Sequence, residues 1–304
     1  MEVLMRNMFQ SLGKSPSANK LAKKYGLRFG AGRFIAGETI RTAIDAVRRL
    51  NADGKVVTLD HLGEFVFTKE EAIESADMCL RTLDAIAEAG VTSNLSLKMT
   101  SLGLDISKDL CMENMRKILD RAKKYGNFVR IDMEDYAHCQ ISLDIYRELR
   151  QEYDNVGLVI QAYLYRTEQD IADLNEINAN LRLVKGAYKE SPEVAFPEKK
   201  DVDENYKKII KQHLLNGNYT AVASHDEAMI EFTKSVVKEH GIPKEQFEFQ
   251  MLYGICEELQ AKLVKEGYKV RVYVPYGIDW FGYFMRRLAE RPANVWFVLK
   301  NLFK

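Results

Sequence analysis

The sequence predicts an α/β protein, a (β/α)8 TIM-like barrel preceded by extra N-terminal helices. Eight strand-like segments, rich in β-branched and aromatic residues, follow one another, and each precedes a helical segment. No tight-turn signal joins two strands into a hairpin, so the connections are helical crossovers between parallel strands. An open doubly wound sheet normally carries a glycine-rich nucleotide loop after its first strand, and this chain lacks one. Eight such units in about 250 residues therefore favour a closed barrel.

The first part of the chain is predicted to be helical as far as about Asp53. Within it, residues 30–39 (GAGRFIAGET) lack the third glycine of a dinucleotide-binding loop, and Glu38 stands where a phosphate-binding loop needs lysine. This segment is interpreted as a loop that leads into a helix ending near Leu50. We assign residues 1–54 to a helical segment packing on the barrel, and residues 55–304 to the barrel domain.

The barrel elements follow in order. Strands are predicted within residues 56–64, 94–100, 128–134, 157–166, 181–188, 219–226, 247–254 and 268–274. Seven helices are predicted between these strands. The first begins at a Thr68-x-x-Glu71 capping box, the second covers 105–125, the third ends at about Tyr153, and the fourth begins at Thr167-x-x-Asp170. The fifth covers about 202–215, and the last two end at His240 and Glu266. After the last strand, Asp279 is predicted to cap a helix that stops at Pro292.

Composition excludes several classes of protein. The 44 basic residues balance the 44 acidic ones, so no net field favours nucleic acid. The four cysteines are scattered, which is typical of a reduced cytosolic chain. No apolar run reaches membrane-spanning length, and the N-terminus lacks a signal-peptide pattern. The five histidines form no metal-binding motif, so no metal is expected.

Residues near the carboxyl ends of the predicted strands, where barrel enzymes place their catalytic groups, are polar or aromatic in nearly every strand and include one leucine. They are Glu64, Lys98, Asp132, Gln161, Arg182, Lys185, Tyr188, Ser224, His225, Leu252 and Tyr273. A ring of such residues predicts a site at this end of the barrel.

The last helix carries two adjacent arginines, Arg286 and Arg287, one turn after Tyr283. Two guanidinium forks beside an aromatic ring suit the binding of a carboxylate. The alternative is a solvated basic edge in which Glu290 pairs with Arg286.

Eight short segments resemble, in the same order along the chain, the corresponding segments of proline dehydrogenases, in particular the monofunctional bacterial type. They are LKMTSLG, IDMED, VIQAY, RLVKGAY, SHD, FEFQML, RVYVPYG and RRLAE. The resemblance implies FAD-dependent oxidation of L-proline to Δ1-pyrroline-5-carboxylate, by hydride transfer from proline C5 to flavin N5. It also implies that electrons pass to a membrane quinone, as the first step of proline degradation to glutamate. The chain is too short for the aldehyde dehydrogenase domain of bifunctional relatives, so a separate pyrroline-5-carboxylate (glutamate semialdehyde) dehydrogenase is expected. The protein would be cytoplasmic, visiting the inner face of the membrane.

The resemblance also implies a role for each substrate-site residue. Lys98, Arg286 and Arg287 would hold the proline carboxylate, and Glu64 would form a gate with Arg287. The pyrrolidine ring would be walled by Tyr188, Leu252, Tyr273 and Tyr283. Because relatives that prefer 4-hydroxyproline have a smaller residue in place of Tyr283, this tyrosine favours plain proline.

The remaining residues would bind the flavin or organise the site. Arg182 would lie against the flavin ring and Gln161 at its edge, while Lys185, Gly186 and Ala187 would meet the pyrophosphate. Ser224 (usually threonine in the family), His225 and Met133 would complete the cofactor contacts. Asp132 would organise the site through Lys98 or Arg182.

Two other functions fit the residues without the resemblance. One is an aldolase-type barrel in which Lys98 or Lys185 forms a Schiff base. The other is a barrel that binds an amino acid without turnover. Lys98 alone is also compatible with a structural ion pair.

Overall fold

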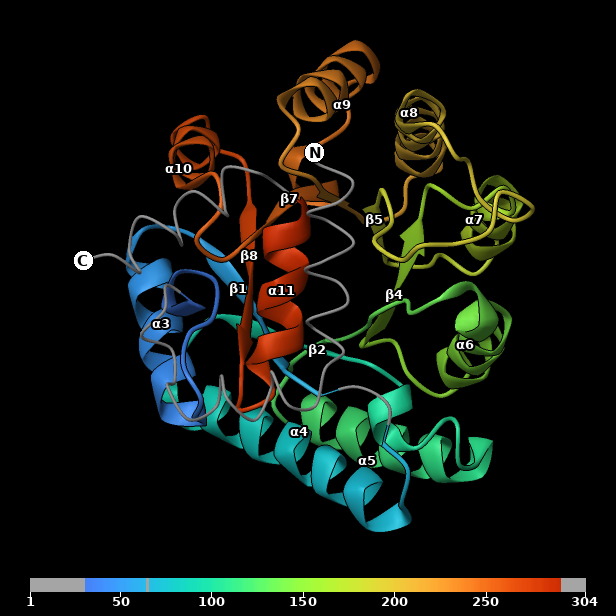
Figure 1. Cartoon of the computed structure of the whole chain (residues 1–304). Coiled ribbons are helices and arrows are strands. Elements are labelled where there is room, and N and C mark those ends of the chain that lie inside the picture. Colours follow the sequence, from blue (N-terminus) through green and yellow to red (C-terminus); the bar gives the residue numbers. More distant parts are fainter. Residues whose placement is uncertain (1–30, 64–65, 291–304) are drawn as a thin grey trace.

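The computed structural model describes residues 31–63 and 66–290, with side chains up to residue 285. Its eight strands form a closed barrel in sequence order, and every neighbouring pair is parallel (Figure 1). The strands are β1 Val56–His61, β2 Ser93–Leu97, β3 Val129–Ile131, β4 Val156–Gln161, β5 Leu181–Val184, β6 Thr220–Ala223, β7 Phe247–Leu252 and β8 Val270–Tyr276. The predicted barrel is thus confirmed: each strand begins within two residues of its predicted segment, although seven of the strands end two to five residues earlier than predicted.

Helices follow the strands as predicted. They are α3 Ile40–Ala52, α4 Lys69–Ala89, α5 Lys108–Lys124, α6 Tyr136–Arg150, α7 Thr167–Asn175, α8 Lys199–Leu215, α9 Glu227–His240, α10 Glu257–Lys265 and α11 Trp280–Glu290. Short 3-10 helices cover Ala31–Arg33, Thr100–Leu102 and Lys244–Gln246. The segment 30–39 is confirmed as a loop from residue 34 to the cap of α3, whereas the helices predicted before it lie outside the described residues.

Both threonine motifs predicted to open a helix lie at a helix start, but only the first forms a capping box. The Thr68 hydroxyl accepts the Glu71 backbone N–H, and the Glu71 carboxylate accepts the Thr68 N–H at 3.1 Å, so the capping box is present. Thr167, by contrast, is the first residue of α7 rather than its cap. Its hydroxyl donates to the Gln161 carbonyl at 2.5 Å and so ties the start of α7 to the end of β4.

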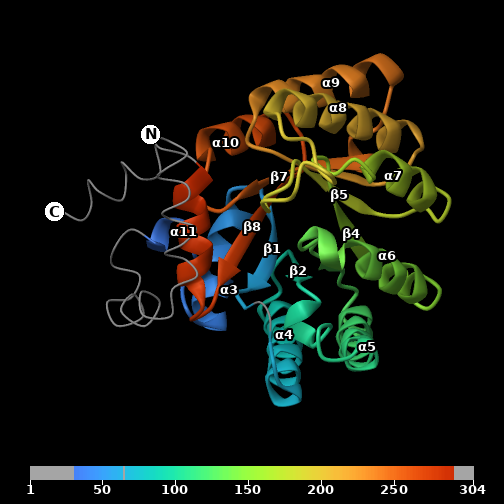
Figure 2. The ribbon, with the colours of Figure 1, turned by 45° about the vertical axis from the view of Figure 1, so that its right-hand side comes forward.

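The outer position beside β8, where the helix after the last strand would be expected, is occupied by a helix that precedes the first strand. Helix α3 buries Ala43, Ile44 and Val47 against β1 and β8, on the outside of the barrel. Helix α11, which follows β8, lies instead across the carboxyl end of the barrel (Figures 1 and 2). There its Trp280 and Phe284 pack with residues that follow other strands, among them Leu62 after β1 and Ile255 after β7.

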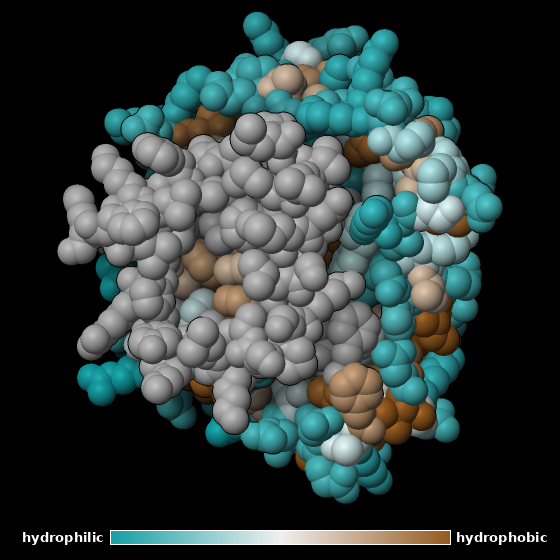
Figure 3. All heavy atoms as spheres, viewed as in Figure 1, coloured by the Kyte–Doolittle hydropathy of each residue, from teal (hydrophilic) through white to brown (hydrophobic). Residues whose placement is uncertain are grey.

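The apolar core surrounds the barrel rather than filling it. One cluster joins the outward side chains of the strands to the helices, with Leu95, Ile131 and Phe249 fully buried in it. Side chains inside the barrel are polar in several strands, as described below. Each described helix is too short or too polar to cross a lipid bilayer. Most of the coloured side chains around the face shown in Figure 3 are hydrophilic.

Candidate functional site

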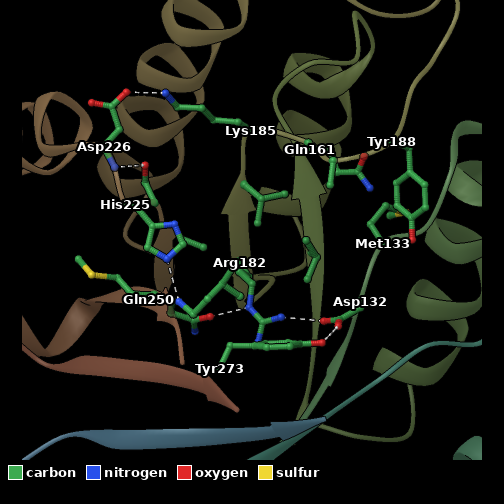
Figure 4. Close-up of a pocket in the computed structure, with 18 of the residues that line it drawn as sticks. Asp132, Met133, Gln161, Arg182, Lys185, Tyr188, His225, Asp226, Gln250 and Tyr273 are labelled. Atoms are coloured by element: carbon green, nitrogen blue, oxygen red, sulfur yellow. Dashed lines mark hydrogen bonds and ion pairs between the residues drawn. The ribbon is translucent and has the colours of Figure 1, made fainter. Parts of the chain in front are cut away.

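A cavity of about 700 Å³ opens at the carboxyl ends of the strands (Figure 4). Fourteen of the residues predicted from the sequence line it: Lys98, Asp132, Met133, Gln161, Arg182, Lys185, Gly186, Ala187, Tyr188, Ser224, His225, Leu252, Tyr273 and Tyr283. The fold therefore brings together residues from β2 to α11, although their roles stay predictions. Glu64 and the side chains of Arg286 and Arg287 lie outside what the structure describes.

Asp132 lies at the centre of the polar groups at the base of the cavity. Its carboxylate accepts hydrogen bonds from Arg182 Nη1 at 2.7 Å, Ser96 Oγ at 2.7 Å and the Tyr273 hydroxyl at 2.8 Å. Lys98 Nζ lies 3.8 Å from the same carboxylate. Both ion pairs considered for Asp132 from the sequence are therefore present, and the carboxylate holds groups from three other strands, β2, β5 and β8, in one arrangement.

Asp60 was missed in the sequence, yet it is the nearer partner of Lys98. The distance from Lys98 Nζ to Asp60 Oδ2 is 3.3 Å, and Asp60 is buried. Burial raises the pKa of Asp60; the charge of Lys98 opposes this shift and that of Asp132 adds to it. Burial and then the charge of Asp132 also raise the pKa of Tyr273 well above its ordinary value, so its hydroxyl stays protonated and donates.

Arg182 and Gln161 each keep one polar atom without a partner among the described residues. Arg182 donates from Nε to Gln250 at 2.6 Å and from Nη1 to Asp132, but its buried Nη2 has no acceptor. Gln161 donates to the Glu134 carbonyl at 2.8 Å, whereas its buried Oε1 accepts nothing. Because buried polar groups are normally satisfied, these atoms indicate where a bound molecule supplies hydrogen bonds.

The other end of the cavity is lined by Lys185, which bridges two carboxylates. Its Nζ lies 2.6 Å from Asp203 on α8 and 2.7 Å from Asp226, the cap of α9. Lys199 also pairs with both carboxylates. Two lysines thus stand beside the start of α9, the kind of place where proteins bind phosphate groups.

Gly186 is required by packing as well as by backbone conformation. Its φ is +116°, and a Cβ there would lie 2.2 Å from the ring of Tyr163. The sequence-based reason for this glycine, close approach to a pyrophosphate, is thus supplemented by a contact that no local pattern reveals.

His225 and Ser224 are held in place by neighbouring backbone groups. His225 Nε2 accepts the Leu252 backbone N–H at 2.9 Å, so the ring proton is on Nδ1 and the imidazole is neutral. The Ser224 hydroxyl accepts the Asp226 N–H at 3.1 Å. Both contacts fix the orientation of the side chains after β6 beside the cavity.

Several other lining residues were not predicted. They are Val159, Val184, Lys199, Ala223, Asp226, Glu227, Gln250 and Met251. Gln250 and Asp60 could have been found from one signal. A buried parallel strand normally reads as a continuous apolar run, but Glu248 and Gln250 alternate with phenylalanines in one strand, and Thr58 and Asp60 alternate with apolar residues in another. That alternation indicates a polar inner face.

The geometry does not favour the alternative chemistries. No group of His, Cys, Asp or Glu side chains in the described part of the chain has an arrangement that could hold a metal ion. A Schiff-base lysine must be neutral to attack a carbonyl, whereas Lys98 lies within ion-pair distance of both Asp60 and Asp132.

Comparison with known proteins agrees with the site. Residues 43–300 match the family model described as proline dehydrogenase. The chain is 56% identical to proline dehydrogenase 2 of Bacillus subtilis over 302 residues, 99% of this chain and 100% of that protein. It is 44% identical to the proline dehydrogenase of Deinococcus radiodurans over 306 residues, 99% of this chain and 98% of that protein.

A solved structure shares the fold. Proline utilization A (PutA) from Bdellovibrio bacteriovorus, inactivated by N-propargylglycine, superposes with a TM-score of 0.81 at 29% sequence identity. The match covers 86% of this chain and 32% of that one, so the chain spans about a third of PutA. With these relatives and a cavity lined by the expected side chains, the chain is an enzyme that belongs to the proline dehydrogenase family.

Proposed function

We propose that the chain oxidises L-proline to Δ1-pyrroline-5-carboxylate with FAD bound in the cavity, and that the electrons pass on to a membrane quinone. The observation that carries this proposal is the group of Lys98, Asp132, Arg182 and Tyr273 at the base of the cavity, in a chain of this family. Through Asp132 it joins a lysine to a buried arginine whose Nη2 has no partner among the described residues.

The residues present fit a flavin. Arg182 Nη2 offers a donor and Gln161 Oε1 an acceptor, which match the mixed hydrogen-bonding edge of an isoalloxazine. Lys185 and Lys199 lie beside the start of α9, where the helix N-terminus adds to their charge, and a pyrophosphate would bind there. A bound FAD supplies the two-electron acceptor for the hydride that leaves proline C5. The chain contributes orientation and a cation, Arg182, near the charge that develops on reduction.

The charges at the base of the cavity support a role for the two arginines of α11. Lys98 and Arg182 face the two carboxyl groups of Asp60 and Asp132, so this set offers little excess positive charge. A substrate carboxylate therefore needs further cations. Arg286 and Arg287 lie on the helix that crosses the mouth, next to the cavity residue Tyr283, and we assign the carboxylate clamp to them together with Lys98.

Aromatic and apolar side chains complete the substrate site. Tyr188, Leu252, Tyr273 and Tyr283 line the cavity and would enclose the pyrrolidine ring. Proline must react with its ring nitrogen neutral, because the nitrogen lone pair assists the loss of hydride from C5. Enclosure by these side chains excludes water and favours that neutral form.

An absorption spectrum tests the proposal. We expect the purified protein to be yellow and anaerobic L-proline to bleach its flavin band, whereas glycine, which lacks the ring, leaves the band intact. N-propargylglycine, a secondary amine with a carboxylate that inactivates the PutA named above, should inactivate this enzyme in a proline-protectable way. A colourless protein, or a flavin that proline cannot reduce, contradicts the proposal.

Electron and product transfer are assigned to separate partners. The chain is 28% identical to the bifunctional protein PutA of Klebsiella aerogenes but covers 26% of it. We assign the next oxidation to a separate pyrroline-5-carboxylate dehydrogenase, and place the enzyme in the cytoplasm with peripheral contact at the inner membrane face. Vesicles with and without quinone test this: reoxidation of the proline-reduced enzyme should be faster with quinone. Equal rates would contradict the quinone assignment.

A further inference from the structure

We propose that Glu248 is a positioning residue that sets the orientation of the Arg182 guanidinium through the amide of Gln250. The inference rests on the proposed function, in which Arg182 faces the flavin. Three side chains form the connection, and all are nearly inaccessible: Glu248 is 2% exposed, Gln250 3% and Arg182 4%.

Inside the barrel, Arg182 donates a hydrogen bond to Gln250, and Gln250 donates one to Glu248. Gln250 Nε2 donates to Glu248 Oε1 at 2.5 Å, and Gln250 Oε1 accepts from Arg182 Nε at 2.6 Å. Figure 4 shows the second of these contacts, with the Arg182 guanidinium held between Gln250 and Asp132.

The charge of Glu248 decides which way the Gln250 amide points. Burial raises the pKa of Glu248, but the charge and hydrogen bonds of Arg271, with those of Gln250 and Tyr219, outweigh burial and lower it to about 2. The carboxylate is therefore ionised and only accepts hydrogen bonds. It attracts the amide NH2 of Gln250, and the amide oxygen is thereby turned toward Arg182.

Glu248 is itself fixed by the barrel. Arg271 donates to it from Nε at 2.7 Å and from Nη2 at 3.1 Å, and the Tyr219 hydroxyl donates at 2.8 Å. Arg271 Nη1 also donates to the Val57 carbonyl of β1 at 2.7 Å. The hydrogen bonds that fix Glu248 thus connect β7 to β8 and, through Arg271, to β1.

The consequence for Arg182 is that its contacts with the described residues leave a single nitrogen free to donate hydrogen bonds. Its Nε is held by Gln250 and its Nη1 by Asp132 and Ser96, which leaves Nη2 as the nitrogen without a partner among the described residues. If Glu248 loses its charge, the Gln250 amide can turn its NH2 toward the guanidinium. Donor would then face donor, and Arg182 would move from the position in which it stabilises charge on the reduced cofactor.

The test compares Glu248→Gln with Tyr219→Phe in the FAD-loaded enzyme. Glu248→Gln keeps the shape and removes the charge, so the flavin reduction potential should fall and kcat should drop at least about tenfold, with KM little changed. Tyr219→Phe removes one hydrogen bond from Glu248 but leaves its charge, so the potential and kcat should change far less than in Glu248→Gln.

A second variant shows whether the effect passes through Gln250. Gln250→Leu should lower the potential by itself, and adding Glu248→Gln to it should change the potential no further. A thermal midpoint that falls while the potential stays unchanged in both single variants overturns the proposal and leaves a structural role only. Failure of the wild-type enzyme to bind flavin or be bleached by proline would instead contradict the proposed function.

Discussion

At the scale of single residues, the site is built from ion pairs whose partners are far apart in the sequence. Asp132 joins Lys98, Arg182 and Tyr273, which come from three other strands. Removing one member leaves a buried charge without its partner, which costs more than the pair itself contributes. Substitutions here should therefore affect folding and catalysis together.

Asp132→Asn tests this coupling. The amide keeps the shape but removes the charge that compensates Arg182 and Lys98, so we expect the free energy of unfolding to fall by about 3 kcal/mol. We also expect kcat/KM for proline to fall by at least about 100-fold. Urea unfolding and steady-state kinetics measure the two effects. Asp45→Asn, which removes an exposed partner of Arg48 on α3, should change neither.

Tyr283→Ser tests the assigned ring pocket. The smaller side chain makes room for a hydroxyl, so kcat/KM for proline should fall relative to that for 4-hydroxyproline. Tyr165→Ser, an exposed position outside the cavity, provides the control. If the ratio is the same in both variants, Tyr283 does not contact the ring.

Residues at the ends of strands could be predicted, whereas their partners inside the barrel could not. Lys98 and Lys185 directly follow the last residue of a strand, a position that the local pattern locates. Asp60 and Gln250 belong to the strands themselves, and their importance depends on which strands face each other across the barrel. That arrangement is a property of closure and register, so only the alternation of polar residues gave a hint of it.

At the scale of elements, a sequence motif predicted a helix cap correctly where the cap depends only on residues close together in the sequence. The Thr68 capping box needs only residues three apart, and it formed. Thr167 has the same spacing to an acidic residue, but its hydroxyl is used by the Gln161 carbonyl at the end of β4. A tertiary contact thus replaced a cap. The positions of α3 and α11 were also beyond prediction, because no local pattern says which helix covers which face.

The cap of α4 makes a direct prediction. Thr68→Ala removes the acceptor for the Glu71 N–H and should lower the free energy of unfolding by about 1 kcal/mol. Thr68→Ser keeps the hydroxyl and should be close to wild type. Denaturant titrations of the two variants make the comparison; an equal loss in both would show that the methyl group, rather than the cap, matters.

His138 ties the start of α6 to the segment before α5. Its ring nitrogens contact Asp135 at 2.5 Å and Asp105 at 2.7 Å. Burial lowers the pKa of His138, but the hydrogen bonds and charges of these two aspartates prevail and raise it above 6.5. The imidazolium therefore stabilises the folded state fully below pH 6.5, and this contribution is lost as the pH rises through the folded-state pKa.

His138→Gln should accordingly cost more stability at pH 6 than at pH 9. Denaturant unfolding of wild type and variant at both pH values measures the difference. Asp45→Asn again serves as the control, since its effect should not change between them. A cost for His138→Gln that is independent of pH would contradict the role of the charged ring.

At the scale of the whole molecule, the cavity depends on the complete ring of strands. Its lining comes from β2 through β8 and from α11, so anything that binds there selects the closed barrel over every partly folded form. Cofactor binding is therefore linked to global stability.

Removal of the proposed FAD should lower the thermal midpoint of the entire barrel. A ligand present at 100 times its dissociation constant adds about 2.7 kcal/mol to the free energy of unfolding. Re-addition of FAD to the stripped protein should restore the midpoint in a concentration-dependent way, whereas riboflavin, which lacks the pyrophosphate, should restore less. Equal recovery with both compounds would remove Lys185 and Lys199 from the cofactor site.

Closure of the barrel joins β1 to β8 in six registered pairs, from Val56 with Arg271 to His61 with Tyr276. During synthesis β1 therefore cannot pair with β8 until the last strand has been made. Lys98 and Asp132 are synthesised long before Tyr273 and α11, which enclose them. A nascent chain halted before residue 270 lacks one wall of the cavity. If the chain binds flavin as proposed, the cofactor enters only at the end of translation, and stalled chains should be colourless.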